Sequence, residues 1–195
     1  MDNKVFALDT YLERLNYSGV VQPTEDRLEA LHRAQVYRIP FENFDILLGR
    51  GISLEPAALC DKLVHRARGG YCFELNGLFL MALQTFGFDA HALLARVHLT
   101  GTPTGRGHQL ALVTLHGREW IAETHPSAFF TFARVAALPT PNGRVSLFNC
   151  TLRTVTPGAE HVQKLEEGQA YLDALKTHFG IALDAPYEAI RPLPH

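Results

Sequence analysis

The sequence has few cysteines, little net charge and no long apolar run, and each shortage excludes a class of protein. The three cysteines, Cys60, Cys72 and Cys150, form no CxxC pair, so neither a disulfide framework nor a metal site is expected. The net charge is −2 with both signs interspersed, which argues against nucleic acid as a partner. No segment approaches the run of about 20 apolar residues that spans a bilayer, and the first residues lack a signal-peptide pattern. We therefore expect a cytoplasmic protein with no membrane contact.

The chain does have a large apolar fraction, because 47% of its 195 residues are hydrophobic, enough for a proper core. In the first half, apolar residues recur every three or four positions, which predicts helices, one over about Pro56 to Arg66. From His91 onward the spacing approaches two, which predicts strands in HALLARVHL, HQLALVTL, EWIAET and SLFNCTLRTV. A last helix is predicted from about Ala159 to His178, ended by Gly180. This order indicates an α+β fold.

The segment ARGGYCFELNGLFLMAL carries the most chemical information. Gly69 and Gly70 end one helix and the apolar spacing after Cys72 begins another, so Cys72 lies in a first helical turn. The N–H groups and the positive end of the dipole there favour a thiolate, the reactive form of the side chain, and the glycines leave room for a substrate. The alternative is a buried structural cysteine, which is how we interpret Cys60 and Cys150.

A nucleophilic cysteine needs a base, and the base works best when a third group orients it. Among ten histidines, we prefer His108 because it opens a predicted strand directly after Gly107, at a sheet end where an active-site group projects. If His116 and Gly117 form a two-residue hairpin turn, Glu123 lies diagonally beside His108, within reach of its ring. A three-residue loop would turn Glu123 to the other face, and a solvated glutamate at the strand end is the alternative.

The motif RGGYCFELNGLF, with IPFENFDILLGRGISL before it and GHQLALV after it, resembles the arylamine N-acetyltransferase family. The resemblance runs from Tyr11 to about Trp120, and YLDALKTHFGIAL resembles the family's closing helix. It implies an N-terminal helical bundle, a β-barrel domain and a papain-like active-site core. It also implies a ping-pong reaction in which acetyl-CoA or another acyl thioester acylates a cysteine and an amine then takes the acyl group, with no permanently bound cofactor.

Position by position, the resemblance assigns Cys72 as the nucleophile, His108 as the base and Glu123 as the acid, where the family normally has aspartate. It further implies an ion pair between Glu42 of PFEN and Arg68 of RGG that supports the site. Two independently solvated charges are the alternative interpretation of that pair.

Two departures from the family affect the substrate pocket. The segment AETHPSAFF stands where the family has a sequence close to VDVGFGG. Between this segment and the closing helix, the resemblance implies much of a second barrel domain and part of a third, but here only about Pro126 to Glu160 are present. The candidates for lining the substrate or donor pocket are Phe41, Tyr71, Gly107 and His125.

We therefore expect three parts: a helical domain over 1–88 with the nucleophile, a reduced antiparallel β-barrel or sheet over 89–158 with the histidine and acid, and a closing helix and tail over 159–195. The expected function is transfer of an acyl group through a Cys72 thioester to a small amine. One alternative is an amide synthase or thioesterase acting on a carrier-bound acyl thioester, with an acyl carrier protein as partner. The other is a non-catalytic homologue that binds a ligand or partner. Uncovered strand edges would favour a homodimer.

Overall fold

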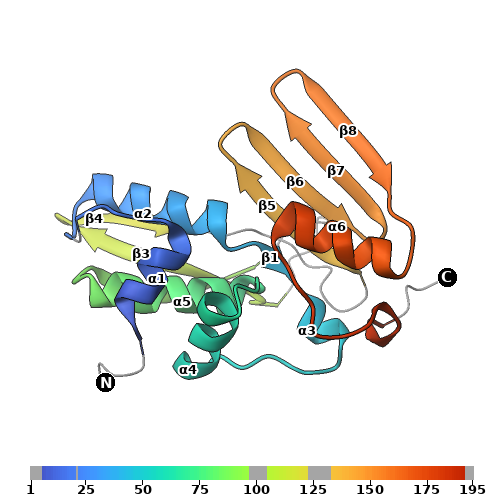
Figure 1. Ribbon diagram of the computed structural model, residues 1–195. Coiled ribbons are helices and arrows are strands. Elements are labelled where there is room, and N and C mark those ends of the chain that lie inside the picture. Colours follow the sequence, from blue (N-terminus) through green and yellow to red (C-terminus); the bar gives the residue numbers. More distant parts are fainter. Residues whose placement is uncertain (1–5, 21, 97–104, 123–132, 192–195) are drawn as a thin grey trace.

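The computed structural model describes residues 6–20, 22–96, 105–122 and 133–191, and these residues form a mixed α+β fold with antiparallel sheets. Figure 1 shows two groups of elements side by side. The first lobe holds helices α1, α2, α4 and α5 with strands β2 to β4, and the second lobe holds strands β5 to β8 with helix α6. The short elements β1 and α3 lie between the two lobes.

Helices make up the first part of the chain and return near its end. Their bounds are α1 Leu8–Leu15, α2 Glu25–Arg38, α3 Phe44–Leu47, α4 Pro56–Leu59, the π-helical turn η1 Cys60–His65, α5 Cys72–Thr85, α6 Gln169–Phe179 and the 3-10 helix η2 Tyr187–Ala189. Together α4 and η1 account for the helix predicted over Pro56 to Arg66. Among the described residues, no helix is both long and apolar enough to span a membrane.

The closing helix is shorter than the sequence pattern predicts. Gly180 ends α6 in the left-handed conformation, as expected of a helix C-cap. The helix begins at Gln169, however, and the segment Ala159–Lys164, predicted as its first turns, is a strand paired with its neighbour. The helical prediction from Ala159 is therefore wrong.

The described strands form two open sheets, so neither closes into a barrel within this part of the chain. Their orders are β1-β5-β6-β7-β8 and β2-β3-β4. The bounds are β1 Phe41–Glu42, β2 Asp89–Ala95, β3 His108–Leu115, β4 Arg118–Ala122, β5 Val135–Thr140, β6 Gly143–Phe148, β7 Thr151–Thr156 and β8 Ala159–Lys164. The predicted strand SLFNCTLRTV is divided between β6 and β7, because Asn149 takes a left-handed conformation and the chain turns there.

The hairpin between β3 and β4 has the two-residue turn that the sequence predicts. His116 and Gly117 both have positive φ, 50° and 75°, as a type I′ turn requires. Leu115 consequently pairs with Arg118, and the described ladder ends with Ala111 opposite Ala122.

Each lobe has its own apolar core. In the first lobe, α5 packs against β2 and β3 and buries Leu75, Leu78, Phe79 and Leu83, each at most 2% exposed. In the second lobe, α6 lies along the sheet (Figure 1). It buries three side chains among apolar residues of β5 to β7 and α3, namely Tyr171, Leu175 and Phe179. Burial of a leucine or phenylalanine side chain stabilises a fold by about 1.5–3 kcal/mol.

Strand β1 and the residue after it join the two lobes. β1 pairs with β5 of the second lobe, and the Glu42 N–H donates to the Gly70 carbonyl of the first at 3.0 Å. The side chain of Asn43, 1% exposed, donates to the Ala133 carbonyl at 2.7 Å and accepts from the Val135 N–H at 2.9 Å. Both lobes are thus fixed beside the segment that precedes Cys72.

Candidate active site

Cys72 is the first residue of α5, and its side chain is fully buried. The preceding residue, Tyr71, is extended, with φ −90° and ψ 178°, and is the N-cap of the helix. Its N–H donates to Glu74 Oε2 at 3.0 Å, the reciprocal contact typical of a capping box. The first helical turn predicted from the sequence therefore exists, and a carboxylate three residues along the helix fixes its geometry.

His108 is the first residue of β3 and is 3% exposed. Two contacts bring this end of β3 to the start of α5. The carbonyl oxygen of Gly107 lies 4.0 Å from Cys72 Sγ, and the Asn76 side chain donates to the Gln109 carbonyl at 2.6 Å. The structure thus places the strand that carries His108 against the turn that carries Cys72.

The surroundings of the Cys72 sulfur change its acidity in two directions. Burial raises the pKa of the thiol, whereas the backbone N–H groups of Gln109, Phe73 and Cys72 itself lower it, and the charge of Glu74 raises it again. The pKa is raised overall, contrary to the expectation from the helix start, because the sulfur is enclosed. A thiolate here requires a proton acceptor beside it.

The glycines before Cys72 serve a different purpose from the one expected. Gly69 and Gly70 are buried, and a side chain at either position would collide with its neighbours: a Cβ on Gly69 would lie 2.3 Å from the Pro40 carbonyl oxygen, and one on Gly70 would lie 2.9 Å from Glu74 Cβ. These glycines therefore permit close packing under the nucleophile turn and do not open space for a substrate.

Two sequence-predicted site residues, Glu123 and His125, lie outside the described residues. The register of β3 and β4 is the one on which the Glu123 prediction depends, and it is described as far as Ala122. Among the pocket candidates, Phe41 is 2% exposed and belongs to the first core, whereas Gly107 is exposed. Tyr71 is half-buried and stacks on Phe73, with ring centroids 5.4 Å apart.

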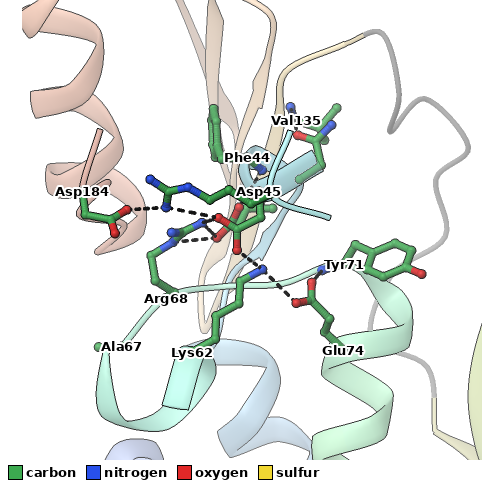
Figure 2. A network of polar contacts seen from close by, with 12 residues as sticks. Phe44, Asp45, Lys62, Ala67, Arg68, Tyr71, Glu74, Val135 and Asp184 are labelled. Carbon is green, nitrogen blue, oxygen red and sulfur yellow. Dashed lines mark hydrogen bonds and ion pairs between the residues drawn. The ribbon is translucent and has the colours of Figure 1, made fainter. Parts of the chain in front are cut away.

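A buried network of charged side chains lies beside the turn and contacts it through Glu74 (Figure 2). Arg68 donates to Glu42 Oε1 through Nε at 2.9 Å and through Nη2 at 2.6 Å, and Nη2 also donates to Asp45 at 3.1 Å. Lys62 Nζ lies 2.8 Å from both Asp45 and Glu74. All five side chains are at most 11% exposed, so the network belongs to the protein interior.

The network continues to the surface and to the second lobe. Arg50 contacts Asp184 at 2.5 Å, in the segment after α6, and lies 3.8 Å from Asp45. A cavity of about 190 Å³ is lined by Arg50, Arg66 and Ser53 together with Asp45, Lys62 and Glu74. Solvent therefore reaches one side of the buried charges.

The charges in the network shift one another's acidity. Burial raises the pKa of Asp45, but the hydrogen bonds and charges of Lys62 and Arg68 outweigh it, so the pKa is lowered. At Glu74, burial dominates over the charge of Lys62 and raises the pKa. Burial lowers the pKa of Lys62, but the charges of Glu42, Glu74 and Asp45 raise it overall. Lys62 therefore stays protonated and holds two carboxylates in place.

The site also contains groups that sequence reasoning did not single out, namely Asp45, Lys62, Glu74 and Asn76. Glu74 has the spacing of a capping box from Tyr71, but that signature has a small polar residue where Tyr71 stands, so the sequence did not indicate its role. Lys62 sits beside Leu63 in an apolar helical pattern, and η1 turns it inward to the core.

Comparison with known proteins decides the family. A family model described as N-acetyltransferase matches residues 24–124, which include Cys72, His108 and the whole charged network except Asp184. The chain belongs to the arylamine N-acetyltransferase family. Among curated members, it is 46% identical over 119 residues to the arylamine N-acetyltransferase / N-hydroxyarylamine O-acetyltransferase of Salmonella typhimurium, and 45% identical over 118 residues to the arylamine N-acetyltransferase of Escherichia coli. Each match covers 60% of this chain and 42% of the relative.

Solved arylamine N-acetyltransferases share the fold over a longer stretch. The structure of the Salmonella typhimurium enzyme superposes with a TM-score of 0.86 at 25% identity, over 95% of this chain and 94% of that one. The Mycobacterium tuberculosis structure superposes with a TM-score of 0.83 at 26% identity, over 90% and 93% of the two chains. The likeness to the family therefore extends in fold beyond the stretch in which it is detected in sequence, where the match spans 42% of each of these two curated relatives.

Proposed function

We propose that this chain is an acyltransferase of the arylamine N-acetyltransferase type, in which Cys72 carries the acyl group, His108 acts as its base and Glu123 orients His108. The strongest support is the junction of α5 and β3, where the Gly107 carbonyl lies 4.0 Å from the Cys72 sulfur and the next residue is the histidine. A buried thiol with a raised pKa becomes a nucleophile only when a base takes its proton.

In the first half-reaction, His108 takes the proton from Cys72 Sγ, and the thiolate attacks the carbonyl carbon of the thioester. The carbon–sulfur bond to the donor breaks, and the leaving thiolate receives the proton from His108. In the second half-reaction, an amine attacks the acyl-Cys72 carbonyl and loses a proton to His108, which returns it to the departing Cys72 sulfur. Backbone N–H groups at the start of α5 would stabilise the oxyanion in both steps.

Relatives suggest the substrates. The Salmonella typhimurium relative is named for arylamine and N-hydroxyarylamine acceptors, and the arylamine N-acetyltransferase of Mycobacterium marinum, with a TM-score of 0.79 at 26% identity, was solved in complex with CoA. We propose acetyl-CoA as the donor, bound only during turnover, and a small aromatic amine as the acceptor. Action in the cytoplasm stays a prediction of the sequence.

The acid of the triad is proposed to be Glu123. Continuing the β3–β4 register one pair beyond Ala111 and Ala122 would set Glu123 opposite Leu110, on the same face as His108. A Bacillus cereus arylamine N-acetyltransferase of the same fold, 19% identical with a TM-score of 0.81, is described as having a Cys-His-Glu catalytic triad. A glutamate is therefore an acceptable acid in one protein of this fold.

The test is intact-protein mass spectrometry after brief incubation with acetyl-CoA. A mass gain of one acetyl group that is absent from Cys72→Ala, and strongly reduced in His108→Ala, would establish the first half-reaction. Glu123→Gln should acylate more slowly while keeping the wild-type unfolding midpoint. Release of the acetyl group on adding an arylamine, with formation of the acetylated amine, would establish the second.

Two other results would redirect the proposal. No acetylation, with Cys72 still alkylated rapidly by iodoacetamide, would indicate a different donor, and acyl groups on an acyl carrier protein should be tried next. If Cys72 is neither acetylated nor rapidly alkylated, that result would contradict an enzymatic role. It would favour a homologue that binds a ligand or partner without turnover.

A further inference from the structure

Asn76 makes the most direct connection between the two elements that carry Cys72 and His108. It lies on α5 one turn after Cys72, and its side chain is fully buried. Its Nδ2 donates to the Cys72 carbonyl at 3.0 Å and to the Gln109 carbonyl at 2.6 Å. An amide nitrogen has two hydrogens, so both are used, one on the nucleophile residue and one on the neighbour of His108.

This connection is unusual for a buried helical position. Burying an amide costs free energy unless its hydrogen bonds are made, and an apolar residue would fill the same place without that cost. Leu75 and Leu78, on either side of Asn76 in the sequence, are buried apolar residues of the first core. A polar side chain among them indicates a requirement for the bonds themselves.

The bond to Gln109 lies at the end of β3 where the described strand pairing is with β2. At its first two residues β3 pairs with β2, as Ala95 with His108 and Leu94 with Gln109, whereas the described ladder with β4 begins only at Ala111. The Asn76 side chain adds a short hydrogen bond, 2.6 Å, between this end of β3 and α5, next to the longer contact between Cys72 Sγ and the Gly107 carbonyl. The Gln109 N–H in turn faces the Cys72 sulfur.

We propose that Asn76 is a positioning residue that fixes the start of β3, and with it His108, at proton-transfer distance from Cys72. This inference rests on the proposed function and names one more residue on which it depends. Asn76 touches no reacting atom; it acts through the placement of His108. Because a misplacement of about 1 Å can cost about 10²-fold in rate, loss of one short hydrogen bond at this end of the strand is enough to be measured.

The test is the pH profile of Cys72 alkylation by iodoacetamide in Asn76→Leu. Peptide mass spectrometry measures how much of Cys72 has reacted at each pH. Leucine keeps the volume and removes both donors. We expect the rate at neutral pH to fall about tenfold or more and the inflection to move to higher pH, because the thiol loses its aligned base. In a His108→Ala background, Asn76→Leu should change nothing further, since the partner through which it acts is already gone. Asn76→Gln, which keeps the donors, should recover part of the rate.

The matched control is Gln35→Leu. Gln35 is a second buried amide, 1% exposed, and it also donates to a carbonyl of α5, that of Leu75 at 3.1 Å, but it contacts neither Cys72 nor β3. Gln35→Leu should alter the unfolding midpoint and leave the Cys72 pH profile unchanged. Cys60, buried in the same lobe, reports misfolding, because it becomes alkylated only when the core opens.

An unchanged profile in Asn76→Leu, or an equal fold-change in the wild-type and His108→Ala backgrounds, would overturn the inference while leaving the proposed function intact. If Asn76→Leu exposes Cys60, Asn76→Ala also removes both donors without placing a branched apolar side chain at this position, and the same comparison is made with that variant. If His108→Ala alkylates at Cys72 with the same pH profile as the wild-type protein, both proposals are overturned together.

Discussion

The two lobes of this protein are stabilised by different means. Between β1 and α5, the first lobe and the joining segment enclose a set of ionised and amide side chains, Glu42, Asp45, Lys62, Glu74 and Asn76 among them. Among the described residues, the core of the second lobe is apolar apart from Arg134, and every residue of its last strand, β8, is exposed. The family is detected in sequence across residues 24–124, in the first lobe and the joining segment, whereas the second lobe follows the family in fold.

The difference has a physical cause. An apolar core tolerates many sequences of similar volume, so the second lobe keeps its fold while its sequence diverges. A buried network of charges tolerates few substitutions, because removing one partner leaves another buried and unpaired. The sequence match to the family covers residues 24–124, and the buried charges around the proposed nucleophile lie within that range.

The largest expected effect is at Arg68, the cation that contacts both Glu42 and Asp45. Arg68→Met leaves two carboxylates with one cation fewer in the core, and we expect it to lower the free energy of unfolding by about 3–5 kcal/mol. Urea denaturation measures the loss. The double variant Glu42→Gln/Arg68→Met should be more stable than Arg68→Met alone; a loss equal to the sum of the single losses would contradict a coupled pair.

A second prediction asks whether the two lobes unfold together. Leu175 is fully buried in the second core, so Leu175→Ala should lower the free energy of unfolding by about 2–5 kcal/mol. Because β1 and Asn43 bind both lobes, fluorescence of Trp120 in the first lobe and far-UV circular dichroism should show the same lowered midpoint. Separate midpoints would show that the lobes are independent, and Cys72 alkylation would then survive the loss of the second core.

The elements that the sequence predicts well are those set by neighbouring residues. The His116-Gly117 turn fixes the register of β3 and β4 through its own backbone, and Gly180 ends α6 by the same kind of local effect. The first turn of α5 follows from the apolar spacing after Cys72. Each of these features depends on a few consecutive positions, so it can be read without knowing what packs against it.

What could not be predicted depends on distant partners. The HVQKLEEG segment has good helix formers, but Ala159–Lys164 pairs with β7 and has no buried face to produce an alternating pattern. Asn76 and Gln109 are 33 positions apart in the sequence, and no spacing rule joins them. The same holds for Lys62 and Asp45, whose contact depends on the π-helical turn η1.

The third prediction concerns acid, and its expected effect is smaller than those of the two core substitutions. The pKa of Asp45 is lowered in the folded protein, so below the ordinary value of about 3.9 the unfolded chain binds a proton that the folded chain still excludes. Asp45 therefore contributes stability above about pH 4 that is lost as the pH falls through its folded pKa. Urea midpoints measured from pH 5 downward should fall, with a shallower slope in Asp45→Asn. An equal slope in both proteins would assign the acid sensitivity to other carboxylates.

The smallest effect is expected where charges meet at the surface. Arg153 and Glu160 form an ion pair between β7 and β8, but their side chains are 50% and 46% exposed, so water and salt screen the attraction. Glu160→Gln should change the free energy of unfolding by less than about 1 kcal/mol. Glu29→Gln, which breaks a pair with Arg33 on α2 of the first lobe whose side chains are more exposed still, 58% for Arg33 and 69% for Glu29, should do the same. If both changes are small, burial decides what an ion pair contributes in this protein, whichever lobe it occupies. If Glu160→Gln costs as much as Arg68→Met, the contrast between the two lobes fails, because the second lobe would then depend on its charges as well.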